Sequence, residues 1–188
     1  MCKQLSELIH QFSTGRVAFL AFMVFILFTT LVLPYQATKA KAKTGNIGSP
    51  DLSFYYTADD LYRMAEAYGE EGRQSYVKAR YTFDLVWPIV YTLFLITGIS
   101  WVNRKAFAVG SFWLRANLVP ILGALFDYLE NVSTSVVMIR YPAQTGVLDG
   151  IAPVFTMVKW VFVNLSFMLL LIGVVTGLLT WLRSRQID

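Results

Sequence analysis

Residues 111–140 read SFWLRANLVPILGALFDYLENVSTSVVMIR, and this stretch decides the fold. It is long and apolar enough to predict a membrane-spanning helix, yet it contains Asp127, Glu130 and Asn131. Ionisable side chains are costly in hydrocarbon, and they usually face a bundle interior, a partner or water. These three residues are therefore the first candidates for a functional site.

The composition of the whole chain agrees with a membrane protein. Of its 188 residues, 56% are hydrophobic and only 15% are charged, and the mean hydropathy is +0.52. These values lie outside the usual range of soluble domains. Four apolar stretches are long enough to cross a bilayer, namely residues 17–35, 81–102, 112–138 and 152–182. We predict an all-α, polytopic four-transmembrane-helix bundle that forms a single domain over residues 1–188.

Basic residues set the predicted topology. They gather at the amino-terminal flank, between helices two and three, and at the carboxy-terminal flank: Lys3, Arg16, Arg104, Lys105, Arg115, Arg183 and Arg185. The positive-inside rule then puts these segments, and both termini, in the cytoplasm. The net charge of +4 is spread among loops and helix ends, so we expect membrane lipids and no nucleic acid as partners.

The connection between the first two helices, residues 36–80, is predicted to lie outside the membrane. Pro34 is expected to end helix one, and residues 36–50 are expected to be irregular because glycine and proline interrupt them. Thr57 followed by Asp60 is the capping signal of an amphipathic external helix. That helix is expected to lie on the outer surface or to cap the bundle.

Helix two is expected to begin upstream, near Glu70, and to carry charged side chains into the membrane. Arg73, Arg80 and Asp84 share one face, and Arg80 can pair with Asp84 one turn later. The pair either makes Asp84 tolerable in the membrane or, together with Arg73, binds an anionic headgroup. Pro88 is expected to kink the helix and to free backbone carbonyls near Asp84.

Helix three is predicted to have a polar face and an opposite apolar face. One face collects small and polar residues: Pro120, Gly123, Ala124, Asp127, Glu130, Asn131 and Thr134. The opposite side is expected to face lipid: Leu122, Leu125, Leu129, Val132 and Val136. Small residues allow helices to approach closely, while the polar ones have to find partners.

Polar residues on three helices are predicted to converge. Asp84, Glu130 and Asn164 each lie seventeen residues from a tryptophan next to a basic flank, which places all three at ~26 Å along straight helices. Because the three residues are expected to lie at the same depth, near the outer side, we predict that they line one pocket that opens to the outside. Lys159 either extends to the outer interface or neutralises the carboxylates of this pocket.

The chemistry of such a pocket follows from its carboxylates. Asp84, Asp127 and Glu130 suit general acid/base catalysis, or the binding of a divalent cation such as Mg²⁺ or Ca²⁺. The residues expected to contact a ligand are Asn131, Asn164, Arg73, Arg80, Lys159, Trp87 and Tyr91. Because Cys2 is the only cysteine and His10 the only histidine, multi-cysteine metal sites and histidine-cluster zinc chemistry are excluded.

The segment FDLVWP at residues 83–88 resembles the EXPERA-type sterol isomerase and sigma-2 receptor group, as do the four spans and the long first external loop. A matching acidic motif in helix three is lacking. No residue roles are therefore transferred from that group.

The amino-terminal residues 1–12 place Leu5, Leu8, Ile9 and Phe12 on one helical face. This pattern predicts either a short helix at the cytoplasmic interface or the first turns before helix one. The apolar run that follows is longer than that of a signal peptide, so we expect it to be retained as a transmembrane helix.

Three classes of function are compatible with these patterns. The leading hypothesis is a membrane protein that binds or processes a lipid or other amphipathic small molecule, which includes a lipid-modifying enzyme. A structural or assembly subunit, joined to a homodimer mate or a membrane-protein partner through its buried polar residues, is the first alternative. A small proton- or cation-coupled transporter is the second.

Overall fold

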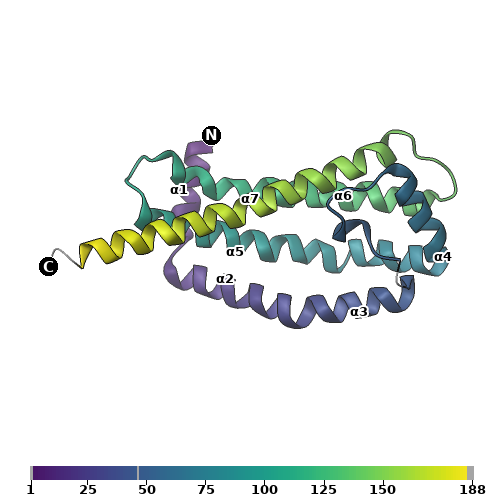
Figure 1. Ribbon diagram of the computed structural model, residues 1–188, viewed down its shortest axis with the longest axis horizontal. Helices are drawn as coiled ribbons and strands as arrows, with labels where there is room; N and C mark the ends of the chain where they lie inside the picture. Colours follow the sequence, from purple (N-terminus) through teal and green to yellow (C-terminus); the bar gives the residue numbers. More distant parts are fainter. Residues whose placement is uncertain (1, 46, 186–188) are drawn as a thin grey trace. The chain divides into compact units, whose positions relative to one another are not determined.

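The computed structural model describes residues 2–45 and 47–185, and all regular structure in these residues is helical (Figure 1). The elements follow in this order: α1 Cys2–Phe12, α2 Gly15–Leu27, η1 Phe28–Val32, α3 Leu33–Thr44, η2 Pro50–Leu52, α4 Ala58–Arg80, α5 Phe83–Ala106, η3 Phe112–Leu118, α6 Val119–Arg140 and α7 Val147–Ser184. Met1, in the predicted interfacial segment, and Asn46, in the predicted irregular segment, lie outside the described residues. The predicted all-α class is confirmed.

Three helices in the described residues are long and apolar enough to cross a membrane. They are Gly15–Thr44, Ala58–Ala106 and Val147–Ser184, and they are compatible with a multi-pass membrane protein. The second of these joins α4 and α5, of which α5 carries the apolar run. Helix α6 does not meet the same criterion, because its polar residues lower its hydropathy.

The predicted end of helix one was wrong. The helix does not stop at Pro34 but continues through the π-helical segment η1 into α3, which ends at Thr44. Pro34 lies inside this helix directly after η1, where π-type bonding already replaces the regular pattern, because the Leu33 N–H donates to the Phe28 carbonyl five residues earlier. Residues 39–43 alternate lysine and alanine, which are good helix formers, so they extend the helix instead of forming the predicted irregular segment.

The other predicted boundaries differ by one or two turns. Helix two begins at Phe83, after a turn at residues 81–82, so it is not continuous with the helix that starts near Glu70. The start of helix three is the 3-10 helix η3, and only α6 is α-helical. Helix four begins at Val147, five residues before the predicted start, and Pro153 lies inside it, where it lacks the N–H that would bond the Asp149 carbonyl.

The two predicted faces of helix three are present in α6. The small and polar face is buried or nearly so, and four leucine and valine side chains of the opposite side are exposed: Leu122, Leu125, Leu129 and Val132. Val136, also predicted to face lipid, is half-buried. An exposed apolar side opposite a buried polar one is the inverse of a water-soluble amphipathic helix.

The chain divides into two compact units, and α5, α6 and α7 each contribute residues to both. Unit 1 comprises Met1–Ile26, Val90–Gly123 and Val161–Asp188, and unit 2 comprises Leu27–Ile89 and Ala124–Trp160.

Unit 1 has an aromatic core and a polar contact that holds α1. The Phe25 and Phe94 rings stack with centroids 4.6 Å apart, and Phe167 lies 6.3 Å from Phe94. Helix α1 packs against η3. In Figure 1 it runs across the direction of α2, which begins three residues after it ends.

The contact between α1 and η3 is made by a set of uncharged polar side chains, here called the neutral network: Ser6, His10, Ser100 and Asn117. Ser6 Oγ donates to Asn117 Oδ1 at 2.8 Å, and Asn117 Nδ2 donates to Ser100 Oγ at 2.9 Å. The imidazole Nε2 of His10 lies 3.0 Å from the Leu114 carbonyl, to which it donates. All four side chains are buried, so the bonds satisfy groups that water does not reach.

Unit 2 has a core built by α4. Its buried apolar side chains are Tyr56, Leu61, Ala65, Tyr68, Tyr76, Val137, Met138 and Ala152, which come from α4, the end of α6, the start of α7 and the segment before α4. The predicted capping box is present, because Thr57 Oγ1 accepts from the Asp60 N–H at 3.1 Å and Asp60 accepts from the Thr57 N–H at 2.8 Å. Helix α4 thus packs on the end of α6 and the start of α7 within unit 2.

Helix α4 breaks at Gly69, one residue before the predicted helix start near Glu70, and it packs on α3. Gly69 adopts φ 62° and ψ −178°, which only glycine adopts readily, and it separates two helical halves. Lys43 of α3 forms an ion pair with Glu71. A Cβ at Gly72 would lie 3.2 Å from the Lys43 carbonyl oxygen, so glycine allows the backbones of α3 and α4 to approach closely.

Candidate functional site

Unit 2 gathers seven charged or amide side chains, here called the charged cluster: Asp51, Arg80, Asp84, Asp127, Glu130, Asn131 and Lys159. They come from η2, the end of α4, the start of α5, the middle of α6 and α7. Six of the seven are buried, and Asp51 is half-buried. The cluster therefore joins segments that are far apart in the sequence.

Arg80 is the centre of the cluster. Its Nε lies 3.1 Å from Asp84 Oδ2, which confirms the predicted pair, and its Nη2 forms an ion pair with Asp51. Its Nη1 donates to Asn131 Oδ1 at 3.1 Å, and its guanidinium stacks 4.5 Å from the centroid of the Tyr76 ring. A planar guanidinium can bind several partners in this way, whereas an ammonium group cannot.

Asn131 connects α6 to α5 at the predicted proline. Because Pro88 has no N–H, the Asp84 carbonyl lacks the helical donor four residues later. Asn131 Nδ2 lies 3.5 Å from that carbonyl oxygen and 3.3 Å from Asp127 Oδ1. The prediction that Pro88 exposes a carbonyl near Asp84 is thus confirmed, and a side chain of α6 occupies the position of the missing donor.

Glu130 and Lys159 form the third ion pair of the cluster. Glu130 is fully buried, and the Lys159 ammonium pairs with its carboxylate. Lys159 is itself buried, and Asp127 is close enough to contribute to its electrostatic environment. Two roles were predicted for Lys159, and the neutralisation of a carboxylate is the one observed.

Outside the helices, the electrostatics of the cluster are visible at Asp51 and Tyr56. Burial by itself would raise the pKa of Asp51, but the Arg80 and Lys159 charges outweigh it and hold this pKa below its ordinary value. Burial raises the pKa of Tyr56, and the Glu130 charge acts in the same direction. Thr156 Oγ1 donates to the Tyr56 hydroxyl at 3.1 Å, which ties the segment before α4 to α7.

The charges of the cluster do not balance. It contains four carboxyl groups, Asp51, Asp84, Asp127 and Glu130, and two cationic groups, Arg80 and Lys159. Unbalanced charge in a buried site is costly, and it is relieved by a bound proton, a cation or hydrogen-bond donors. The cluster therefore has the capacity to take up a positively charged or hydrogen-bonding group.

The predicted metal site is not formed by these carboxylates. In the described part of the chain, no three histidine, cysteine, aspartate or glutamate residues are grouped so that they could hold a metal ion. The physical reason is that Asp84 pairs with Arg80 and Glu130 pairs with Lys159. Asp84, Asp127 and Glu130 thus lie in one cluster without converging on a single point.

Two predicted ligand-binding residues lie elsewhere in unit 2. Trp87 stacks with Phe28, with ring centroids 6.3 Å apart. Arg73 donates from Nη1 to the Ala65 carbonyl at 2.9 Å and stacks 4.7 Å from the centroid of the Tyr141 ring. Tyr91 and Asn164, which were also predicted to contact the ligand, belong to unit 1, and their contact with a ligand stays a prediction.

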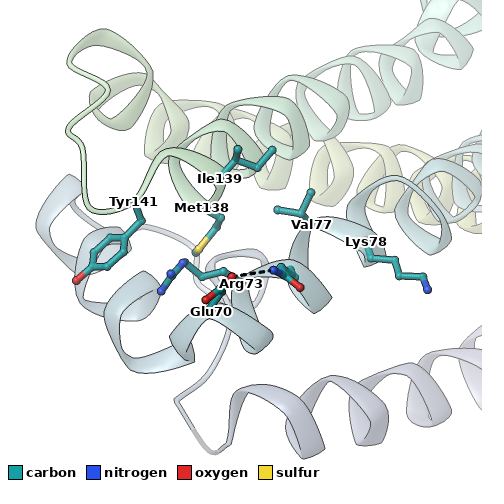
Figure 2. Close-up of a pocket in the computed structure, with 8 residues that line it drawn as sticks. Glu70, Arg73, Val77, Lys78, Met138, Ile139 and Tyr141 are labelled. Carbon is teal, nitrogen blue, oxygen red and sulfur yellow. Dashed lines mark hydrogen bonds between the residues drawn. The ribbon is translucent and has the colours of Figure 1, made fainter.

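Arg73 instead lines a surface hollow of unit 2, shown in Figure 2, with a volume of about 660 Å³. Its walls come from α4 and from the end of α6: Glu70, Arg73, Gln74, Val77, Lys78, Met138, Ile139 and Tyr141. Apolar side chains thus lie beside charged ones, and Gln74 Nε2 donates to Glu70 Oε1 at 3.2 Å. The hollow therefore has both apolar and charged walls.

Sequence reasoning missed Asp51, Tyr56, Tyr76 and Thr156. Asp51 lies in a short 3-10 helix within a connection, and only the folding of that connection brings it to Arg80. No local spacing signals such a contact. Tyr76 could have been found, because it precedes Arg80 by one helical turn and so lies on the same face.

The described chain is thus an all-helical protein with three helices long and apolar enough to span a membrane, and with a buried charged cluster in one of its units. Comparison of the chain with protein-family models, curated proteins and solved structures found no match.

Proposed function

We propose that this chain is a multi-pass integral membrane protein with four transmembrane helices and both termini in the cytoplasm, and that unit 2 binds a lipid or another amphipathic small molecule. The three long apolar helices support the membrane placement. The exposed leucines of α6, opposite its buried polar face, support α6 as the fourth span. The basic flanks support the orientation.

The unequal number of carboxyl and cationic groups in the charged cluster carries the proposal. With four carboxyl groups against two cationic groups, the cluster has a formal excess of negative charge that a positively charged ligand can offset. A positively charged or hydroxylated headgroup would supply the donors, and Asn131 would help to orient it. In a lipid-modifying reaction, the same carboxylates would transfer protons.

The hollow beside α4 supports the amphipathic character of the ligand. Val77, Met138 and Ile139 offer apolar contact, and Arg73 and Lys78 offer positive charge. Helix α4 is rich in charged residues and lies outside the apolar run of α5, as a headgroup-binding segment would.

The test compares Asp127→Asn with Asp59→Asn, which removes the same charge from an exposed position of α4. Both proteins are purified in mild detergent, and co-purified lipids and other small molecules are quantified by mass spectrometry. We expect Asp127→Asn to retain about tenfold less of a specific amphipathic molecule, equivalent to ~1.4 kcal/mol. Equal retention by both variants and the wild type would overturn the proposal.

The second candidate is a structural or assembly role, which the ion pairs favour. They connect η2, α4, α5, α6 and α7 within unit 2, so the cluster can serve as the contact that holds these segments together, or holds a partner subunit. In that case Asp127→Asn and Glu130→Gln would lower thermal stability or dissociate a homodimer or partner complex, and no small molecule would be lost.

A further inference from the structure

Helix α1 presents three different faces, and the buried one is polar. Ser6 is 2% exposed and His10 is 9% exposed, and both belong to the neutral network. Ser13, just after the helix, is 1% exposed, and Arg104 donates to its carbonyl oxygen. The protein-facing side of α1 is therefore held by hydrogen bonds and contributes little apolar packing.

The apolar side of α1 is exposed. Leu5, Leu8 and Phe12 lie at spacings of three and four, so they form one stripe, and Leu8 is 50% and Phe12 70% exposed. In a helix that faces only water and protein, this stripe would be the buried one. The observed arrangement is the reverse, so the stripe needs an apolar environment that unit 1 itself does not supply.

The third face of α1 is charged or polar and also exposed. It consists of Lys3, Gln4, Glu7 and Gln11, and Lys3 Nζ lies 3.8 Å from Glu7 Oε1. A helix with protein on one side, water on the second and an apolar medium on the third matches a helix at a membrane surface. A helix inside a bundle would not expose its polar face, and a helix on a purely aqueous surface would not expose its apolar stripe.

The direction of α1 supports the same environment. It runs across α2, whose exposed Phe19 and Leu20 begin the apolar surface of the first candidate span (Figure 1). If α2 crosses the bilayer, α1 lies along the bilayer surface, at the level where that apolar surface begins. Lys3 and Arg16 are placed to meet anionic phospholipid headgroups.

We propose that α1 is an interfacial helix whose Leu5–Leu8–Phe12 stripe inserts into the lipid at the membrane surface, while the neutral network holds its opposite side on η3. The occupant of the stripe is the bilayer, because the stripe continues the apolar exposed surface of α2 and adjoins basic residues. This rests on the membrane placement in the proposed function, but not on the charged cluster or its ligand.

The test uses spin labels on the full chain in vesicles of phosphatidylcholine and phosphatidylglycerol. The exposed Cys2 is replaced by serine, and single cysteines are introduced as Leu8→Cys, Glu7→Cys and Leu20→Cys. Each nitroxide is tested for collision with oxygen, which concentrates in lipid, and with a water-soluble nickel chelate. We expect the ratio of oxygen to nickel collisions to be severalfold higher at position 8 than at position 7, and to approach that at position 20.

Two outcomes would overturn the inference. In the first, position 8 is as accessible to nickel as position 7, so the stripe is in water. In the second, position 8 is shielded from both reagents, so another protein surface covers it. Leu5→Cys repeats the measurement on the same stripe in case Leu8→Cys does not fold. A water-like label at position 20 would instead contradict the membrane placement itself, so the two failures are distinguishable.

Discussion

The two units bury polar groups in opposite ways. Unit 2 uses full charges, with Arg80 and Lys159 each paired to carboxylates, whereas unit 1 uses the uncharged groups of the neutral network. A buried ion pair adds little net stability as a unit, yet losing one member is very costly, because the other charge is left unsatisfied. A neutral hydrogen bond contributes less and costs less to remove. The charged unit is therefore expected to be the more sensitive to single substitutions.

The largest expected effect comes from separating the Glu130–Lys159 pair. Glu130→Gln leaves the Lys159 ammonium buried without its full counter-charge, and we expect a loss of about 3–5 kcal/mol of stability. The double variant Glu130→Gln/Lys159→Met removes both charges and should recover most of that loss. Thermal unfolding in detergent measures both. Equal Tm values for the two variants would mean that the pair does not act as a charge pair.

Arg80→Lys is expected to have the next largest effect. It keeps the positive charge but loses the planar fork that reaches Asp51, Asp84 and Asn131 at once. Because hydrogen bonds to charged groups are lost, we expect about 2–3 kcal/mol of destabilisation in the same unfolding measurement. Arg63→Lys, on an exposed pair of α4, is the control and should change little. A Tm near that of the wild type for Arg80→Lys would show that charge alone matters.

In unit 1, Asn117→Ala tests the neutral network. The change removes the partners of the Ser6 and Ser100 hydroxyls, so we expect a smaller loss of about 1–2 kcal/mol. Limited proteolysis should also cleave within α1 more readily, because fewer bonds hold this helix on η3. A loss as large as that of Glu130→Gln would remove the contrast between the two units.

The smallest expected effects concern the dependence of Tm on pH, and His10 and Asp51 are expected to act in different pH ranges. Burial lowers the pKa of His10, so the unfolded chain binds a proton at this residue more readily than the folded chain. The contribution of neutral His10 to the stability of the fold is therefore lost as pH falls below about 6.5. Burial opposes ionisation of Asp51, but the Arg80 and Lys159 charges and the hydrogen bonds to its carboxylate together outweigh burial and lower its pKa. The contribution of Asp51 to stability is therefore present above about 3.9 and is lost only below that value. His10→Gln should remove the first dependence and Asp51→Asn the second, as measured by Tm against pH. If both substitutions changed the Tm in the same pH range, the assignment of these two ranges to His10 and Asp51 would be wrong.

Local geometry explains what could be predicted from the sequence. The Arg80–Asp84 pair, the Thr57–Asp60 capping box, the Gly69 break and the exposed Asp84 carbonyl all follow from helical spacing within a few residues. The two faces of α6 follow from the same periodicity.

The errors have a different origin, because they concern contacts or continuations that no local pattern defines. Asp51 meets Arg80 only after a connection folds back. Pro34 was expected to stop a helix, and it is instead accommodated directly after the π-helical segment η1. Counting residues from tryptophans assumes straight and uninterrupted helices, and because Asn164 belongs to a different unit from Asp84 and Glu130, their grouping stays a prediction.

The π-helical segment η1 lets the first helix hold one extra residue without turning α3. A π turn holds one residue more than an α turn, so deleting one residue from Phe28–Val32 would restore regular α-helical bonding there and leave the orientation of α3 unchanged. A deletion inside α3, before Lys43, has no π turn to absorb it, so every later residue would turn by about 100° around the helix axis. Lys43 would then move away from Glu71, and its carbonyl would leave the backbone of Gly72. The loss of one residue is thus expected to be tolerated in η1 and to disrupt the contact between α3 and α4 when it falls in α3.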